Sequence, residues 1–346
     1  WSDFANVVFL ESPAFVGFSY SNTSADASVG DARAARDAVA FLRGFLARHP
    51  SLADAPFFIA GESYAGHYVP ELAAAILAAN GEEGAAPIRL EGIMAGNAWT
   101  DPPRDNYGAP LFWAQHAIVS EAALLAVNAT CDFSKIGPLS AGSRNDACDA
   151  AVDEAMAEMG DINIYQIYAD VCHEAQAREA RQLGRALGDN HPLGRALLAR
   201  LGSTHQEKGL KDPPYDPCIE NRAVEFLNTP SVQAAFHANQ TGDRRPYPWS
   251  DCSDIVEYSR SDLLTSVVPV YKDLVAAGVR VVVYSGDVDA IVPVTGTKLW
   301  LPELGLKPAS KWRPWTDPGG QVGGWVTAYD TGKADFTFAT VRGAGH

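Results

Sequence analysis

The sequence is poor in positive charge, in methionine and in long apolar runs. It contains 27 lysines and arginines against 42 aspartates and glutamates, which gives a formal net charge of −15, and it has three methionines among 346 residues. Nucleic acid and anionic membrane surfaces repel such a charge, which argues against both as partners. No apolar run approaches the roughly 20 residues of a membrane-spanning helix, so we expect no membrane span. With 47% hydrophobic residues, the chain can still bury a sizeable core.

Cysteine is also scarce. The five cysteines stand singly, without a C-x-x-C pair, which argues against zinc or thioredoxin-like chemistry, and we expect no metal or other cofactor. Three N-x-[ST] tripeptides, at Asn22, Asn128 and Asn239, lie in polar, turn-like surroundings. One such tripeptide means little, but three together favour N-glycosylation and hence the secretory pathway.

The first hundred residues alternate between strand-like and helix-like segments. Ser28 and Asp31 form an S-x-x-D capping signal for the first helix, which we expect to end before His49 and Pro50. In chain order, apolar runs and helical spacing predict a strand at 6–10 buried on both faces, the capped helix, a strand at 56–60, a helix at 68–79 and a strand at 90–95. This order is typical of a parallel sheet covered by helices.

The alternation lapses between about residues 101 and 250. This stretch holds four of the five cysteines and an Arg-rich, Gly-broken run at 175–211, which is either an exposed mobile segment or a protease-sensitive linker. The alternation resumes with a helix at 263–277, a strand at 279–284 and a hairpin of 325–329 with 336–341. We therefore expect one α/β core, made of residues 1–100 and 251–346, that is interrupted by an inserted region at 101–250.

A G-x-S-x-A-G motif, Gly61 to Gly66, lies directly between a predicted strand and a predicted helix. This is the setting of a nucleophile elbow, in which a sharp turn presents the serine, here Ser63. The amide of the next residue, Tyr64, then points to where an oxyanion would form at the helix N-terminus. A serine between glycines is more often a plain turn, but the strand–turn–helix context favours a nucleophile.

A serine nucleophile needs a base and an acid that orients the base. Two acids, Asp287 and Asp289, follow the predicted strand at 279–284, at the edge where open α/β sheets place their sites. A Gly-rich loop after the last predicted strand ends in His346. The order serine, acid, histidine is that of α/β hydrolases. His67, one turn past Ser63, is expected to pack or cap.

These segments resemble the serine carboxypeptidases, peptidase family S10, of the plant class II type. The matching stretches are 6–22, 58–70, 284–293 and 340–346, with weaker similarity through the rest, including Tyr215–Cys218 and Trp249–Cys252. The resemblance thus covers nearly the whole chain. It implies an α/β-hydrolase fold with a mostly parallel central sheet and an inserted cap region. It also suggests a homodimer and a vacuolar or extracellular destination.

The resemblance assigns roles to individual residues. It makes Ser63 the nucleophile, Asp289 the triad acid and His346 the general base, and so leaves Asp287 non-catalytic. Two glutamates of the family bind the free C-terminal carboxylate of the peptide, and they correspond to Glu11 and Glu62. Because two glutamates facing a carboxylate cannot all be ionised, at least one must hold a proton. We therefore expect an acidic optimum, with peptide binding that weakens as the pH rises.

The family also has a Gly-rich loop upstream of residue 6 that donates the second oxyanion amide, and this sequence does not contain it. The resemblance pairs Cys131 with Cys148 and Cys172 with Cys218. It also implies that Cys252 is unpaired here, because the family pairs this cysteine with one that lies upstream of residue 1. We therefore expect the chain to be truncated at both ends and, taken alone, to be inactive. Phe15 stands where the family usually has glycine.

Three readings of the function remain. The first is a carboxypeptidase that acts on peptide or protein C-termini, which the glutamate before Ser63 favours. The second is an acyltransferase or a hydroxynitrile lyase, since both occur on this scaffold. The third is a truncated, non-catalytic relative that acts by binding.

Overall fold

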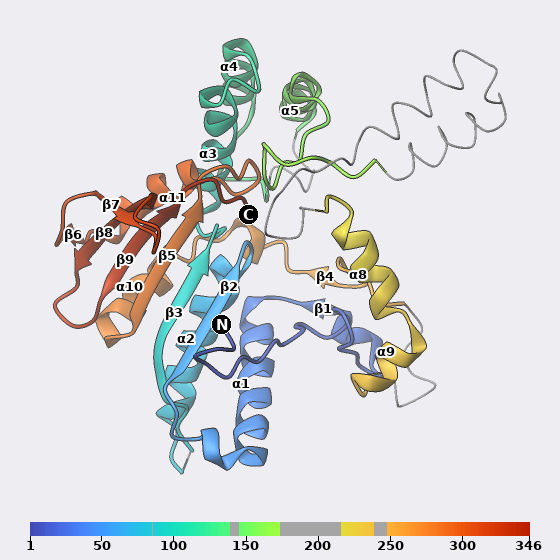
Figure 1. Cartoon of the computed structure of the whole chain (residues 1–346), viewed down its shortest axis with the longest axis vertical. Coiled ribbons are helices and arrows are strands. Elements are labelled where there is room, and N and C mark those ends of the chain that lie inside the picture. Colours follow the sequence, from blue (N-terminus) through green and yellow to red (C-terminus); the bar gives the residue numbers. More distant parts are fainter. Residues whose placement is uncertain (85, 139–144, 174–215, 239–247) are drawn as a thin grey trace. The chain divides into compact units, whose positions relative to one another are not determined.

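The computed structural model describes residues 1–84, 86–138, 145–173, 216–238 and 248–346 (Figure 1). Contacts within the chain group the residues into two units. The first unit joins Trp1–Tyr168 to Cys252–His346, and the second is Ala169–Asp251. The helices between residues 101 and 168, which the sequence analysis assigns to the inserted region, therefore cluster with the sheet.

The first unit contains a seven-stranded sheet. Its order is β2-β3-β5-β9-β8-β6, and β7 pairs with β8. Strands β2, β3, β5 and β9 are parallel, and β8 runs antiparallel to β9, β6 and β7. The bounds are β2 Phe57–Glu62, β3 Leu90–Gly96, β5 Arg280–Gly286, β6 Lys307–Pro308, β7 Arg313–Thr316, β8 Val322–Asp330 and β9 Phe336–Val341. The three strands predicted at 56–60, 90–95 and 279–284 are thus confirmed as β2, β3 and β5, and the predicted hairpin is confirmed as β8 and β9.

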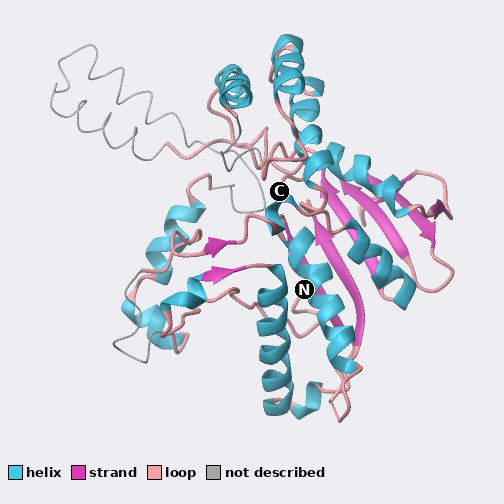
Figure 2. Cartoon of the chain, turned by 180° about the vertical axis from the view of Figure 1, so that it is seen from behind, coloured by secondary structure: helices cyan, strands magenta, loops and turns pink. Residues whose placement is uncertain are grey.

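Helices cover one face of this sheet, which is the face turned toward the viewer in Figure 2. Alternate residues on the central strands point into the core, among them Ile59, Ile93 and Val281, because side chains of a strand alternate between its faces. They pack against residues of α1, α2 and α10, such as Leu42 and Ile76. The bounds of the helices in this unit are α1 Asp31–Arg48, α2 Ala65–Asn80, α3 Pro102–Gln115, α4 Glu121–Thr130, α5 Asp146–Met159, α10 Val268–Ala277 and α11 Val294–Trp300.

A second core lies among α3, α4 and α5. It includes Phe112, Val127 and Val152, and the disulfide between Cys131 and Cys148 ties α4 to α5. A separate two-stranded parallel ladder pairs β1, Ser28–Val29, with β4, Glu257–Tyr258.

The second unit is described in part. Its described residues form helices α8, Ile219–Leu227, and α9, Pro230–Ala235, and a disulfide joins Cys172 to Cys218. Both disulfides that the resemblance implies are therefore present. The Arg-rich run at 175–211 and Asn239 lie outside the described residues.

The predicted strand at 6–10 is wrong. These residues form no strand and are exposed, Phe9 to 90%. An apolar run becomes a strand only where a neighbouring backbone pairs with it, and within the described residues none pairs with this one.

Two helix starts also differ from the prediction. Ser28 does not cap α1, because it belongs to β1; Gly30 is the N-cap, and the carboxylate of Asp262 accepts the Asp31 amide at 2.8 Å. The predicted helix at 263–277 begins at Val268 instead, because proline at 269 is tolerated only in the first turn. Among the helices described, none combines the length and the apolar character that crossing a bilayer requires.

Candidate active site

Ser63 lies on a sharp turn between β2 and α2. Its φ is +63°, in the left-handed region that side chains other than glycine rarely adopt. The backbone is held on both sides, because the Ser63 amide donates to Gly96 O at 3.0 Å and the Trp99 amide donates to Ser63 O at 2.9 Å. The turn leaves no room around Gly66, where a Cβ would lie 2.0 Å from Trp99 O. The small residues of the motif are therefore a steric requirement of the turn.

The amide of Tyr64 follows directly, as the N-cap of α2. Hydrogen bonds to this amide are absent in the part of the chain that the structure describes, which leaves it available to an oxyanion. A cavity of about 160 Å³ opens beside Ser63, lined by Ser63, Tyr64, Trp99, Asp105, Asn106, Ala109, Pro138, Tyr165, Ile291 and Val292.

Asp289 and His346 form a hydrogen-bonded pair. Nδ1 of His346 lies 2.8 Å from Oδ2 of the fully buried Asp289. Asp289 also accepts the side-chain amide of Asn97 at 2.8 Å and the backbone amide of Ile291 at 2.8 Å. The His346 amide donates to Tyr165 O at 2.7 Å. A buried carboxylate that is bonded in this way fixes the imidazole with Nδ1 protonated, and Nε2 is then the basic nitrogen.

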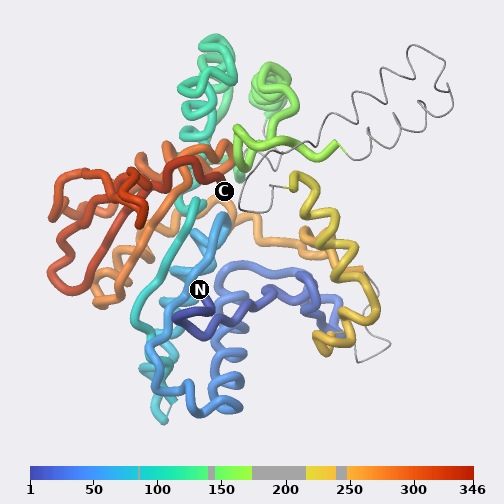
Figure 3. Tube along the Cα trace, viewed as in Figure 1, coloured from blue at the N-terminus to red at the C-terminus, as the bar shows by residue number. Residues whose placement is uncertain are grey.

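Glu62 lies near that second nitrogen. Oε1 of Glu62 is 3.7 Å from Nε2 of His346, and the side chain of Glu62 is about half exposed. Among the described residues, no hydrogen bond joins the Ser63 hydroxyl to the imidazole. The fold thus brings Ser63, Glu62, Asp289 and His346 to the carboxyl edge of the parallel strands, where the chain ends at the point marked C (Figure 3).

A family model described as serine carboxypeptidase, Peptidase S10, matches residues 1–346. The chain belongs to the serine carboxypeptidase family. It is 41% identical over 349 residues to serine carboxypeptidase 24 of Arabidopsis thaliana, an alignment that covers 100% of this chain and 69% of that protein. It is 40% identical over 348 residues to serine carboxypeptidase-like 25 of the same plant, with the same coverage.

The fold is also found in a solved structure. Kex1(delta)p, a prohormone-processing carboxypeptidase from Saccharomyces cerevisiae, superposes with a TM-score of 0.67 at 18% identity, covering 98% of this chain and 69% of that chain. At this identity the likeness shows the fold alone. The mostly parallel sheet with its helices is accordingly an α/β-hydrolase fold, and the protein is an enzyme of the serine carboxypeptidase class.

Glu11 is held by its own loop. Its Oε2 accepts the Phe18 amide at 2.5 Å, and its backbone carbonyl accepts the Ser19 hydroxyl at 2.6 Å. A Cβ at Gly17, where φ is +54°, would lie 1.9 Å from Glu11 Oε1, so a larger residue there would displace the Glu11 carboxylate. Phe15, in the same loop, has a φ of +73°, which gives a physical reason for the glycine that the family usually has at this position.

Sequence reasoning missed Asn97. Its Nδ2 donates to Asp289, the candidate triad acid, and its Oδ1 accepts the Gly286 amide at 2.9 Å, so that it bridges the ends of β3 and β5. The available signal was its position two residues after the predicted strand at 90–95. Another expectation needs correction: Asn128 lies in α4 and not in a turn, and its Oδ1 is buried. Asn22 is exposed, and Cys252, which is in neither disulfide, is exposed as well.

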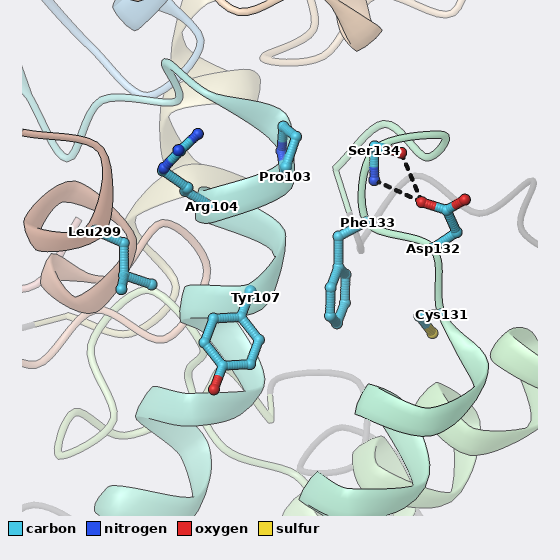
Figure 4. A pocket seen from close by; sticks show the side chains of 8 residues that line it. All are labelled: Pro103, Arg104, Tyr107, Cys131, Asp132, Phe133, Ser134 and Leu299. Atoms are coloured by element: carbon cyan, nitrogen blue, oxygen red, sulfur yellow. Dashed lines mark hydrogen bonds between the residues drawn. The ribbon is translucent and has the colours of Figure 1, made fainter. Parts of the chain in front are cut away.

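A second cavity, of about 710 Å³, contains none of these candidate residues. It opens between α3, α11 and the segment after α4, and it is lined by Pro103, Arg104, Tyr107, Cys131, Asp132, Phe133, Ser134 and Leu299 (Figure 4). Its one cationic lining group is already engaged, because Arg104 pairs with Asp101 at 3.1 Å and with Glu303 at 2.6 Å.

Proposed function

We propose that this chain is a serine-type carboxypeptidase that releases C-terminal amino acids from peptides through an acyl-enzyme. The observation that carries the proposal is the pairing of His346 Nδ1 with the buried Asp289 at 2.8 Å, at the sheet edge that also bears Ser63 in its strained turn. Strain that the surrounding hydrogen bonds maintain is typical of functional sites.

In the proposed reaction, Ser63 Oγ attacks the carbonyl carbon of the last peptide bond and Nε2 of His346 takes the hydroxyl proton. The Tyr64 amide stabilises the oxyanion, and the imidazolium returns the proton to the leaving amine. Water then repeats the attack on the acyl-enzyme with the same base. Because Glu62 lies 3.7 Å from Nε2, a protonated Glu62 competes with the Ser63 hydroxyl as a donor to that nitrogen. A substrate carboxylate that accepts a hydrogen bond from the protonated Glu62 would remove this competition.

The direct test is release of the C-terminal amino acid from a blocked dipeptide by the protein that carries this chain. We expect release to fall by about 10⁶-fold in Ser63→Ala, because the covalent step is lost. Ser51→Ala, at an exposed serine outside the site, is the control and should keep full activity. Transfer of an acyl group from a sugar ester, without release of amino acid from the dipeptide, would contradict the proposal.

The acidic optimum is a separate prediction. Because at least one of Glu11 and Glu62 must hold a proton to accept a carboxylate, we expect KM for the dipeptide to rise above about pH 6 while kcat changes less. Glu62→Gln keeps a neutral donor and should flatten this rise. The exposed Glu83→Gln is the matched control and should retain it. A KM that stays constant from pH 4 to 8 would defeat the proposed carboxylate site.

The two disulfides support a secretory destination, whether vacuolar or extracellular, because such bonds persist in oxidising compartments. Glycosylation of Asn22, which is exposed, fits the same route. The homodimer stays a prediction from the family resemblance.

A further inference from the structure

A buried polar cluster lies behind the nucleophile turn and takes no part in the triad. At its centre is Asp31, the first residue of α1. Oδ2 of Asp31 lies 2.9 Å from Nδ1 of His67, and Oδ1 accepts the hydroxyls of Tyr258 at 2.6 Å and Tyr64 at 3.3 Å. His67 is fully buried, and its Nε2 has no partner among the described residues.

The ring of Tyr64 is enclosed by this cluster. It stacks on His67 with ring centroids 4.8 Å apart and planes 18° apart. The rings of Tyr68 and Tyr258 meet it edge-on, at 5.0 Å and 5.3 Å. Since aromatic rings at these distances attract one another, the side chain of Tyr64 has little rotational freedom.

The charges of the cluster are complementary. Burial raises the pKa of Asp31, but hydrogen bonds from His67, Tyr258 and Tyr64 outweigh this effect and hold it below its ordinary value. Asp31 is therefore a carboxylate at neutral pH and accepts all three bonds. Burial, together with this carboxylate, raises the pKa of Tyr64, whose hydroxyl thus stays a donor. A carboxylate can only accept, so Nδ1 of His67 donates.

Asp31 is itself fixed in space. The carboxylate of Asp262 accepts its backbone amide at 2.8 Å, and β1 leads into it from a ladder with β4, which carries Tyr258. Helices α1 and α2 lie side by side, so the start of α1 faces the start of α2 (Figure 1). The Asp31 carboxylate is thus a fixed hydrogen-bond acceptor beside Tyr64, the residue that follows Ser63.

We propose that Asp31, with His67 and Tyr258, is a positioning residue that holds the Tyr64 side chain and so aims the Tyr64 amide at the oxyanion. This inference rests on the proposed function, because it gives a role to the oxyanion amide of that reaction. An anchored side chain leaves its own peptide plane little freedom to rotate. A preorganised donor stabilises developing charge without reorganisation, whereas a donor displaced by a fraction of an ångström does so poorly.

The test compares Tyr64→Phe with Tyr68→Phe in the protein that carries this chain. Both variants remove one hydroxyl from the same aromatic cluster, but the structure shows a bond to Asp31 only for Tyr64 and Tyr258. For Tyr64→Phe we expect kcat per labelled serine to fall about tenfold while KM changes less than about twofold, because only the transition state uses the amide. Tyr68→Phe, which loses a hydrogen bond to Tyr258 and none to Asp31, should lower kcat by less than Tyr64→Phe does. Titrating the reactive serine with a fluorophosphonate counts only the folded active sites, so unfolded protein does not lower the measured kcat.

Inhibitors distinguish positioning from a merely structural role. A peptide aldehyde forms a hemiacetal whose oxygen occupies the oxyanion position, and the blocked amino-acid product does not. We expect Tyr64→Phe to weaken the aldehyde about as much as it lowers kcat and to leave product binding unchanged. Equal weakening of both inhibitors would overturn the proposal.

A second pair of variants keeps the idea testable if Tyr64→Phe folds poorly. His67→Leu removes the donor to Asp31, whereas His67→Asn can present an amide near the position of Nδ1. We expect His67→Asn to retain several-fold more kcat than His67→Leu. Wild-type kcat in both Tyr64→Phe and His67→Leu would refute the positioning role alone. Wild-type protein that releases no amino acid and is not labelled at Ser63 would refute the proposed function, and this inference with it.

Discussion

Ser63 and Asn97 both hold backbone conformations with positive φ, at +63° and +36°. Such conformations cost about 1–3 kcal/mol each when the residue is not glycine. Both residues lie at the carboxyl ends of neighbouring parallel strands, and both are pinned by backbone hydrogen bonds, Ser63 to Gly96 and Asn97 to Tyr284 O at 2.9 Å. Strained backbone is thus present at the candidate nucleophile, Ser63, and at the residue that bonds the candidate triad acid, Asn97.

The buried carboxyl of Asp105 predicts how the stability of the protein depends on pH. Its Oδ2 accepts the amides of Thr100 at 2.7 Å and Asp101 at 2.8 Å, while Oδ1 is buried without a partner among the described residues. Burial raises the pKa of Asp105 from 3.8 to about 7. Between these two values the folded protein keeps a proton that the unfolded chain has lost, so the free energy of unfolding must fall as the pH rises.

The variant that tests this is Asp105→Asn, which cannot exchange the proton. We expect wild type to lose stability relative to Asp105→Asn between pH 4 and 7, by at most on the order of 4 kcal/mol. Urea unfolding at several pH values measures the difference. The exposed Asp153→Asn on α5 serves as the control and should track wild type. Parallel pH profiles for wild type and Asp105→Asn would show that Asp105 is ionised in the folded protein.

Helix α1 shows how a distant residue can replace a local signal. Its capping oxygen comes from Asp262, and the S-x-x-D motif that starts at Ser28 contributes no side-chain cap. The reason lies in β1: once Ser28 and Val29 pair with Glu257 and Tyr258, the serine is committed to a strand and cannot fold back onto the helix.

This cap can be tested by stability measurements. We expect Asp262→Ala to lower the free energy of unfolding by about 1 kcal/mol, because the Asp31 amide loses its acceptor. Ser28→Ala should change it by no more than a few tenths of a kcal/mol. Asp262→Asn retains an oxygen and should recover part of the loss. A larger loss from Ser28→Ala than from Asp262→Ala would show that Ser28, and not Asp262, caps α1.

Across the first unit, the parallel strands determine where the candidate triad forms. Ser63 follows β2, Asp289 follows β5 and His346 follows β9, and these strands all run in one direction. Their carboxyl ends therefore share one edge of the sheet, and residues separated by more than 280 positions in sequence come together there. The segments that interrupt the α/β pattern, α3 to α5 among them, form a separate core, and so they leave the register of the sheet intact.

Local sequence determined the elements whose cause is local. The strands β2, β3 and β5, the hairpin of β8 and β9 and the elbow at Ser63 follow from apolar periodicity and turn chemistry, which act over a few residues. The choice of Asp289 over Asp287 required the family resemblance, since both acids follow the same strand. The structure is consistent with that choice: Asp289 bonds His346, while Asp287 accepts the Gly343 amide at 2.7 Å.

Tertiary structure decided whatever depends on a remote partner. The run at 6–10 has the composition of a strand but pairs with no neighbouring backbone among the described residues, and the cap of α1 comes from residue 262. The bridging role of Asn97 and the polar cluster at Asp31 likewise depend on groups that meet only after folding. Periodicity and propensity describe a segment's own preference, whereas hydrogen-bond partners and burial are properties of the surroundings that the whole chain creates.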